Sequence, residues 1–271
     1  SKAFSCKEIY RIVLSEGLDV EVVSGGELYT ALQAGVPGSQ IHFQGNNKSV
    51  GELTMAIENG VGDIVVDNRE ELERLETIAM EHNMVASVSF RIKPGIDAHT
   101  HEFIRTGQID SKFGLDLASG EAMDALRRAQ QLEHIAVKGL HCHIGSQILE
   151  KAPFVHAAEV MLQFFAEIRD VLGMTLETLN LGGGFGIHYT QQDDAIPYEE
   201  YMGDVSAMVH RKCQELGLQL PRIYIEPGRS IVGEAGITLY TVGSIKEIPG
   251  VRNYVAIDGG MFDNPRYALY Q

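Results

Sequence analysis

The sequence predicts a (β/α) barrel, and two observations support that prediction. Short apolar runs rich in β-branched residues alternate with longer amphipathic runs over residues 1–230, which is the pattern of βα units around a parallel sheet. The runs supply seven strands, and a helix begins within a few residues of Ser1, so one further strand upstream would complete an eightfold (β/α)8 barrel. The same alternation allows one alternative, an open doubly wound sheet.

Each strand candidate is a short apolar run next to turn-forming residues, and each helix candidate is a longer amphipathic run. The expected strands are 19–24, 40–45, 63–67, 85–92, 136–145, 176–184 and 221–228. The expected helices are 5–16, 26–35, 49–60, 68–82, 118–132, 154–173 and 198–216. The helix from Asn68 has the clearest start, because Asp67 or Asn68 can cap free amides and two glutamates follow at the positive end of the helix dipole.

The character of the sequence changes after Ser230. The stretches EAGITLYTVGSIKEI and NYVAIDGGM alternate like antiparallel strands and contain no helical run. We therefore expect a barrel over residues 1–235 that lacks most of its first strand, and the beginning of a β domain over residues 236–271. The chain stops in the apolar and aromatic stretch RYALYQ, so both ends are expected to have been cut from a longer protein.

Charge and composition narrow the classes of partner. The chain has 37 acidic and 22 basic residues among 271 and a net charge of -15, which argues against nucleic acid or an anionic membrane and favours a small-molecule ligand. No run approaches the roughly 18 apolar residues of a membrane span, and no signal-type region follows Ser1. Cys6, Cys142 and Cys213 are unclustered, which is typical of a reducing compartment. We expect a cytoplasmic protein that does not contact membranes.

Three consecutive strand ends have unusual residues. HCHIGSQ from His141 ends one strand, GGGFG from Gly182 ends the next, and EPGR from Glu226 ends the one after. The carboxyl ends of barrel strands are where such folds place their chemistry. An imidazole, a bare backbone loop, and a carboxylate with a guanidinium are therefore expected at one edge.

The GGGFG loop has two interpretations. Glycine clusters often make tight strand-to-helix turns, but backbone amides without side chains can also approach a phosphate closely. The loop lacks the lysine and hydroxyl of a Walker loop and the spacing of a dinucleotide fingerprint. A monophosphate is the ligand that this loop indicates.

His141 and His143 lie two apart on a strand and therefore point to the same face. They could be a metal pair, a structural pair, or a pair of which one member contacts a cofactor. A metal pair would need further ligands from other strand ends, and His99 and His101 follow Pro94 in a loop. We favour a histidine that contacts a cofactor and expect no metal.

Glu226 ends a buried strand, where an unpaired carboxylate would cost several kcal/mol. Arg229 could compensate it as an internal ion pair. Pro227 and Gly228 form a turn that could instead separate the two side chains, leaving Glu226 for a protonated ring nitrogen and Arg229 for a phosphate or carboxylate.

Seven motifs together resemble the diaminopimelate decarboxylase family. They are KAFSC at Lys2, VVSGGEL at Val22, GNNKS at Gly45, HCHIGSQ, GGGFG, EPGRSIVG and DGGMFDNPRYALY. EPGR and the glycine loop also look like those of ornithine, arginine and carboxynorspermidine decarboxylases, whereas SGGE and DNPRYALY favour the diaminopimelate family. The resemblance implies a fold-type III enzyme dependent on pyridoxal 5'-phosphate (PLP). It also implies an alanine-racemase-like TIM barrel, a C-terminal antiparallel β domain, and a homodimer with shared active sites.

The resemblance also implies roles for individual residues. Lys2 resembles the Schiff-base lysine, although only SKAF of the family's Y-A-x-K-A-F pattern is present. His143 resembles the residue that stacks on the pyridine ring and acts with Lys2 in catalysis, and Glu226 resembles the partner of the ring nitrogen. The other expected cofactor contacts are Ser146, Gly182, Gly183, Gly184, Gly228 and Arg229. The expected substrate contacts are Arg229, Arg266 and Tyr270.

The implied reaction converts meso-2,6-diaminopimelate to L-lysine and carbon dioxide, the last step of lysine biosynthesis. The related decarboxylases named above, a non-catalytic homologue that binds a partner, and a metal-dependent hydrolase remain alternatives. The family's Cys-Glu motif, which crosses the dimer interface, is not present up to Gln271.

Overall fold

The computed structural model of the chain describes residues 1–96 and 111–265. It divides into two compact units, Ser1–Gly233 and Glu234–Gln271. The boundary between the two domains that was expected from the sequence lies two residues later, after residue 235. Each unit is described by itself below.

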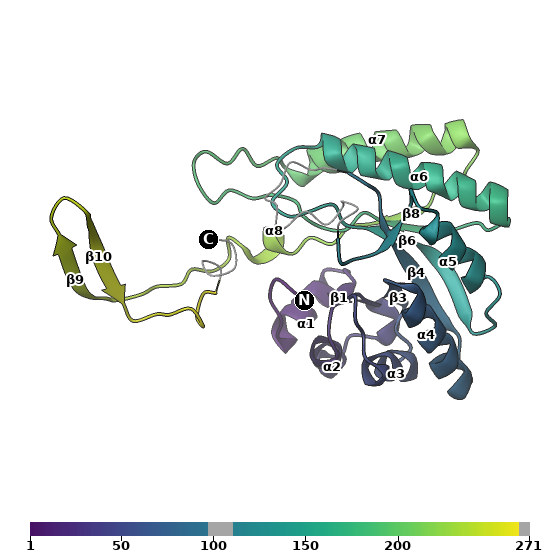
Figure 1. Ribbon diagram of the computed structural model, residues 1–271, viewed down its shortest axis with the longest axis horizontal. Coiled ribbons are helices and arrows are strands. Elements are labelled where there is room, and N and C mark those ends of the chain that lie inside the picture. Colours follow the sequence, from purple (N-terminus) through teal and green to yellow (C-terminus); the bar gives the residue numbers. More distant parts are fainter. Residues whose placement is uncertain (97–110, 266–271) are drawn as a thin grey trace. The chain divides into compact units, whose positions relative to one another are not determined.

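The first unit is built on one parallel sheet that follows chain order (Figure 1). Its strands are β1 (Val20–Val22), β2 (Ile41–Phe43), β3 (Asp63–Val66), β4 (Ala86–Lys93), β5 (Leu115–Asp116), β6 (Ile135–Cys142), β7 (Thr178–Asn180) and β8 (Arg222–Tyr224). They pair in the order β1-β2-β3-β4-β6-β7-β8, with β5 beside β4. A doubly wound sheet reverses direction at a switch point, whereas this order never reverses. The order is that of a (β/α) barrel, and the predicted fold class is confirmed.

The longer helices lie on the outer side of the curled sheet (Figure 1). They are α1 (Lys7–Ser15), α2 (Gly25–Ala34), α3 (Val50–Glu58), α4 (Arg69–Glu81), α5 (Glu121–Ala129), α6 (Ala152–Leu172) and α7 (Tyr198–Leu216). The short α8 (Arg229–Val232) follows the end of β8. Asn68 caps α4, because its side chain accepts the Glu71 amide at 3.0 Å. Ser49 caps α3 in a capping box with Glu52. The strand β5 and the helix α8 were not expected from the sequence, and most expected elements are present with slightly shorter bounds.

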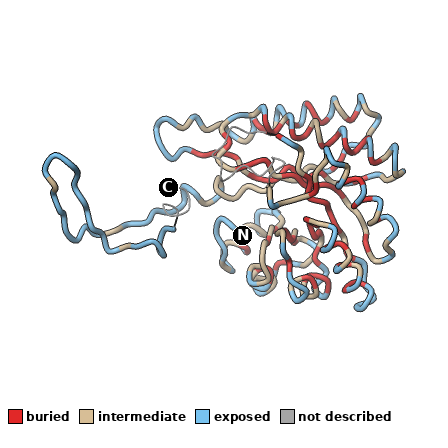
Figure 2. Tube along the Cα trace, viewed as in Figure 1, coloured by how far each residue is buried: buried red, intermediate tan, exposed pale blue. Residues whose placement is uncertain are grey.

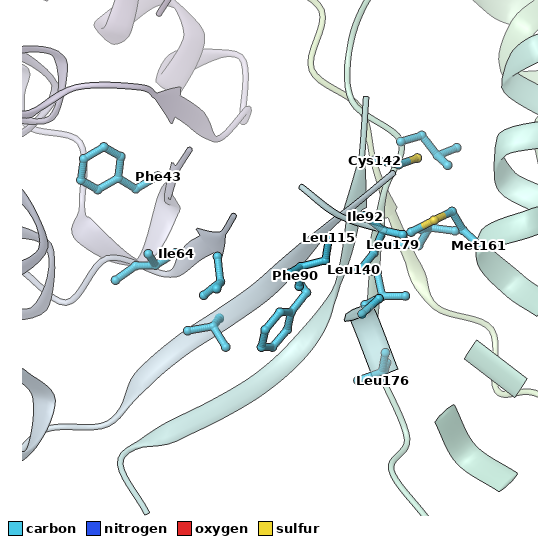
Figure 3. Close-up of a cluster of buried hydrophobic side chains, with 14 of the residues drawn as sticks. Phe43, Ile64, Phe90, Ile92, Leu115, Leu140, Cys142, Met161, Leu176 and Leu179 are labelled. Carbon is cyan, nitrogen blue, oxygen red and sulfur yellow. The ribbon is translucent and has the colours of Figure 1, made fainter. Parts of the chain in front are cut away.

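The hydrophobic core lies between the sheet and the helices. Apolar side chains at every second strand position point outward, so the core follows the pleat of the sheet. Figure 3 shows part of this layer, with side chains from β4, β6 and β7 close to Met161 of α6. Figure 2 shows the buried positions concentrated along these strands and on the inner sides of the helices.

The other face of the sheet points to the barrel interior and is polar. Alternation places the second set of side chains there. They include Glu21, His42, Gln44, Asp63, Ser89, Arg91, His141, Asn180 and Glu226. Several of these are buried, Gln44 at 3% exposed and His141 at 0% among them. Buried polar groups of this kind need partners within the protein, which makes the interior the first place to look for a site.

The second unit contains an antiparallel hairpin. β9 (Val242–Ile248) pairs with β10 (Arg252–Ile257), with Tyr254 opposite Lys246. The alternation seen in the sequence therefore did predict antiparallel strands here. Nearly every residue of the hairpin is exposed (Figure 2).

In the part of the chain that the structure describes, no helix is both long and apolar enough to cross a bilayer.

Candidate active site

Glu226 follows β8 at the carboxyl edge of the sheet and is held by side chains from three other strands. Asn180 of β7 donates its amide nitrogen to Oε1 at 2.7 Å, and Gln44, which follows β2, donates to the same oxygen. His141 of β6 places Nε2 3.3 Å from the carboxylate. The Glu226 side chain is 11% exposed, so these polar contacts replace water that burial has removed.

The protonation of Glu226 depends on opposing effects. Burial raises its pKa to about 7, while the hydrogen bond from Asn180 and the positive charge of Arg91 act in the opposite direction. Burial lowers the pKa of His141 well below its ordinary value, so the imidazole is neutral. With Nδ1 of His141 buried and without a partner in the described residues, the tautomer protonated on Nε2 fits best, because it donates to Glu226.

Glu21 on β1 is a second carboxyl group in the interior. Burial raises its pKa to about 8, and the negative charge of Glu226 acts in the same direction. The charges of the N-terminus, Lys2 and Arg91 oppose that shift. Two carboxyl groups and a buried guanidinium therefore share one low-dielectric space, where ionisation of Glu226 disfavours ionisation of Glu21.

The GGGFG loop packs against the ends of two other strands so closely that side chains are excluded. A Cβ on Gly183 would lie 2.2 Å from the Glu226 carbonyl oxygen, and one on Gly184 would lie 2.2 Å from that of Gly145. Gly182 and Gly184 also have φ values of +70° and +106°. The loop is therefore a tight turn, as in the structural interpretation, and it also leaves a bare backbone beside Glu226.

His143 lies against the same loop. Its Nδ1 accepts the Gly183 amide at 3.3 Å. Burial lowers the pKa of His143 well below its ordinary value, and the positive charges of Arg91 and Lys2 act in the same direction. The ring is thus neutral and fixed at the strand end. Within the described residues no group of three or more potential ligands could hold a metal ion, and His99 and His101 lie outside them.

Arg229 points away from Glu226. Its guanidinium donates to Ser146 Oγ at 2.8 Å and to the Tyr189 hydroxyl, and it lies 5.4 Å from the centre of the Tyr189 ring. The Pro227-Gly228 turn therefore separates the two charges, and the internal Glu226–Arg229 ion pair that the sequence left open does not form. Arg229 and Ser146 come together beside the glycine loop.

Lys2 belongs to a segment that contacts both the first strand of the sheet and the turn that follows its last strand. The amino group of Ser1 donates to the carbonyl of Glu21 in β1 at 2.9 Å. At the β8 side, a Cβ on Gly228 would lie 3.1 Å from the Ala3 Cβ. The Lys2 side chain is exposed, and its charge acts on both Glu21 and His143. Lys2 is therefore located at the same sheet edge as Glu226.

Two expected substrate contacts, Arg266 and Tyr270, lie outside the described residues. The site residues expected from the sequence did not include Gln44, Asn180 or Arg91. Their signal was present in the alternation of β2, β4 and β7, because a polar residue at an inward position of a parallel strand must have a polar partner in the interior.

Comparison with known proteins identifies the family. The family profile described as "Pyridoxal-dependent decarboxylase, pyridoxal binding domain" matches residues 1–233. The chain belongs to this family. A diaminopimelate decarboxylase of Bacillus subtilis is 53% identical over the whole chain, and one of Staphylococcus aureus is 50% identical. The chain spans about 62% of the length of these curated relatives.

Solved structures of the pyridoxal-dependent decarboxylases share the fold. Diaminopimelate decarboxylase from M. jannaschii, solved with L-lysine, matches 97% of this chain and 60% of its own, with a TM-score of 0.88 and 38% identity. The Helicobacter pylori enzyme, also solved with L-lysine, matches 99% of this chain and 68% of its own, with a TM-score of 0.86 and 30% identity.

The residues at the strand ends fit a pyridoxal cofactor. The glycine loop is packed too closely against its neighbours to carry side chains, so its backbone is bare, and Glu226 is a buried carboxyl group beside it with a pKa raised to about 7. Lys2 on the adjoining segment has an amine of the kind that such a cofactor needs. These features come from two strand ends and the first residues of the chain.

Proposed function

We propose that the protein to which this chain belongs decarboxylates meso-2,6-diaminopimelate to L-lysine and carbon dioxide, with PLP as cofactor. The observation that supports this best is the meeting of Glu226, the glycine loop and the Lys2 segment at one sheet edge. The curated relatives named diaminopimelate decarboxylase, and the motifs SGGE and DNPRYALY, favour this substrate over ornithine or arginine.

In this proposal each residue has one task. When bound, PLP accepts the electron pair released as carbon dioxide leaves the substrate. Glu226 keeps a proton on the ring nitrogen, since an ionised carboxylate there favours the protonated ring. His143, neutral and fixed by the Gly183 amide, would contact the ring. Lys2 would supply the amine that holds the cofactor.

The remaining residues bind charged groups at the two ends of the site. The backbone around Gly184 and Gly228, together with Ser146, holds the phosphate, and Gly182 and Gly183, whose amides already donate to Asn180 and His143, shape the loop. Arg229 lies beside Ser146 and contacts the phosphate or the distal carboxylate of the substrate. Arg266 and Tyr270 are assigned to the same distal carboxylate from their motif alone.

Cofactor attachment tests the role of Lys2. The protein is incubated with PLP, reduced with borohydride, digested, and mapped by mass spectrometry. The wild-type protein should have the cofactor on Lys2, and Lys2→Ala should lose both the label and the visible absorbance. Lys7→Ala removes another exposed lysine and is the matched control. Unchanged labelling in Lys2→Ala would refute the assignment.

Product analysis tests the substrate. The native protein that contains this chain is supplied separately with meso-diaminopimelate, ornithine, arginine and carboxynorspermidine, and carbon dioxide and amine products are measured. We expect L-lysine from meso-diaminopimelate. Release of carbon dioxide from ornithine alone would overturn the substrate, and PLP binding without any product would indicate the non-catalytic homologue.

The motif resemblance further supports a homodimer with shared active sites in the cytoplasm, with the three cysteines reduced. Sedimentation equilibrium of the native protein should give twice the monomer mass. Mixing a Lys2→Ala protein with a protein altered in the Cys-Glu motif that crosses the dimer interface should then restore part of the activity.

A further inference from the structure

Asn180 makes two hydrogen bonds in opposite directions. Its amide nitrogen donates to Glu226 Oε1 at 2.7 Å, and its amide oxygen accepts the Gly182 amide at 2.9 Å. The orientation of the side-chain amide is therefore fixed by chemistry, because a backbone N–H can only donate and an ionised carboxylate can only accept. Asn180 is 5% exposed, so water has little access to either contact.

We propose that Asn180 is a positioning residue that joins the two halves of the cofactor site, holding the Glu226 carboxylate with one end and the first glycine of the GGGFG loop with the other. This inference rests on the proposed function, in which Glu226 faces the ring nitrogen and the loop faces the phosphate. The distance between these two parts of the cofactor is fixed by covalent bonds, so a short rigid connection between their protein partners pre-organises the site.

Gln44 supports the first contact from the other side of the interior. Its amide nitrogen donates to the same Oε1 of Glu226, but among the described residues Gln44 makes no hydrogen bond to the glycine loop. The two amides can therefore be separated experimentally, since Gln44 affects Glu226 alone whereas Asn180 affects Glu226 and the loop.

Charged groups from β1, β2, β3 and β4 affect the titration of Glu226. Arg91 and His42 lower its pKa, Asp63 raises it, and Glu21 titrates together with it. Burial has the largest effect on the pKa of Glu226, and the hydrogen bond from Asn180, which lowers that pKa, has the next largest. Loss of this donor should therefore raise the pKa of Glu226 and leave the carboxyl group protonated at a pH where the wild type is ionised.

The test uses two probes that differ by one group, PLP and pyridoxal, which lacks the phosphate. Dissociation constants for both are measured by absorbance over a range of pH. Asn180→Asp keeps an oxygen for the Gly182 amide but replaces the donor toward Glu226. We expect this variant to weaken the binding of PLP and of pyridoxal to the same extent. Both dissociation constants should rise by about tenfold, which is the effect of losing one hydrogen bond to a charged group. The loss should grow with pH, because the new carboxyl group can act as a donor only while it is protonated.

Asn180→Ala removes both contacts. It should weaken the binding of PLP more than the binding of pyridoxal, because only PLP has the phosphate that contacts the loop. Gln44→Glu should reproduce the equal weakening of Asn180→Asp without the additional loss for PLP, and it provides the test if Asn180→Ala does not fold. Asn59→Asp, which adds the same charge at the exposed end of α3, is the matched control and should change neither constant.

Three results would each overturn a different part of the inference. If Glu226→Gln weakens both probes but Asn180→Asp changes neither, Asn180 has no positioning role and the proposed function stands. If Glu226→Gln leaves pyridoxal binding unchanged, the assignment of Glu226 to the ring nitrogen fails, and the proposed function fails with it. An equal loss for PLP and pyridoxal in Asn180→Ala would refute the contribution of the loop.

Discussion

At the scale of single residues, the clearest energetic feature outside the site is the ion pair between Lys48 and Glu71. Both side chains are 2% exposed, and Lys48 Nζ lies 2.7 Å from Glu71 Oε1. Lys48 also donates to the carbonyls of Gly45 and Val65. These contacts hold the β2–α3 loop directly after Gln44, so a buried charge pair supports the position of a residue that contacts Glu226.

Replacing Lys48 with Met should destabilise the protein by about 3–5 kcal/mol near pH 8, because it leaves a buried carboxylate without a partner. Burial already raises the pKa of Glu71 to about 7, and Lys48 opposes that shift, so the variant should have a still higher value. A folded-state pKa above the unfolded value means that stability is present at low pH and is lost as pH rises through the folded pKa. The penalty should therefore be small near pH 5 and large near pH 8 in urea unfolding.

The control for this prediction lies on α4, the helix that contains Glu71. Arg74 and Glu70 form an exposed ion pair with a 3.5 Å separation. Arg74→Met should change stability by less than about 0.5 kcal/mol at either pH. Equal losses in the two variants, or a loss in Lys48→Met that does not vary with pH, would contradict the explanation.

At the scale of elements, the strands around the glycine loop show which features of the fold and site can be predicted from sequence and which cannot. Alternation along the strands predicted which motifs lie at strand ends, because the period of two is a property of each strand alone. It could not predict that Asn180 and Gln44 hold Glu226, since these residues are 46 and 182 positions away along the chain. It also could not separate a barrel from a doubly wound sheet, because both alternate in the same way and only strand order distinguishes them. β5 has two residues, too few for any periodicity to show.

Gly183→Ala should strongly destabilise the protein and weaken PLP binding. Its Cβ would lie 2.2 Å from the Glu226 carbonyl oxygen, so β7 and β8 would have to separate at the point where Glu226 is held. We expect a loss of about 1–3 kcal/mol, as for other overpacked positions. Gly51→Ala is the matched control, because it lies in α3 with nothing within 4 Å of the new Cβ. It should stabilise by about 0.4–1 kcal/mol, and thermal unfolding of both variants measures the contrast.

At the scale of the whole molecule, stability is concentrated in the first unit. The buried hydrophobic side chains of the described residues run from Tyr10 to Cys213. The hairpin of β9 and β10 has exposed side chains on both faces, and an isolated two-stranded hairpin is at best marginally stable in water. The two units of this chain should therefore differ widely in local stability, although each has regular backbone hydrogen bonds.

Native-state hydrogen exchange of this chain should show that difference directly. Amides of β4 and β6, central in the sheet, should exchange only through global unfolding, whereas amides of residues 242–257 should exchange through local opening at a far lower free energy. Adding urea below the unfolding transition should accelerate the central strands and leave the hairpin rates nearly unchanged, because the hairpin exposes little new surface when it opens. The comparison between strands of one molecule removes differences in sample and pH. Hairpin amides as protected as those of β4 would mean that these strands are covered in solution, and the contrast in local stability inferred from burial would be wrong.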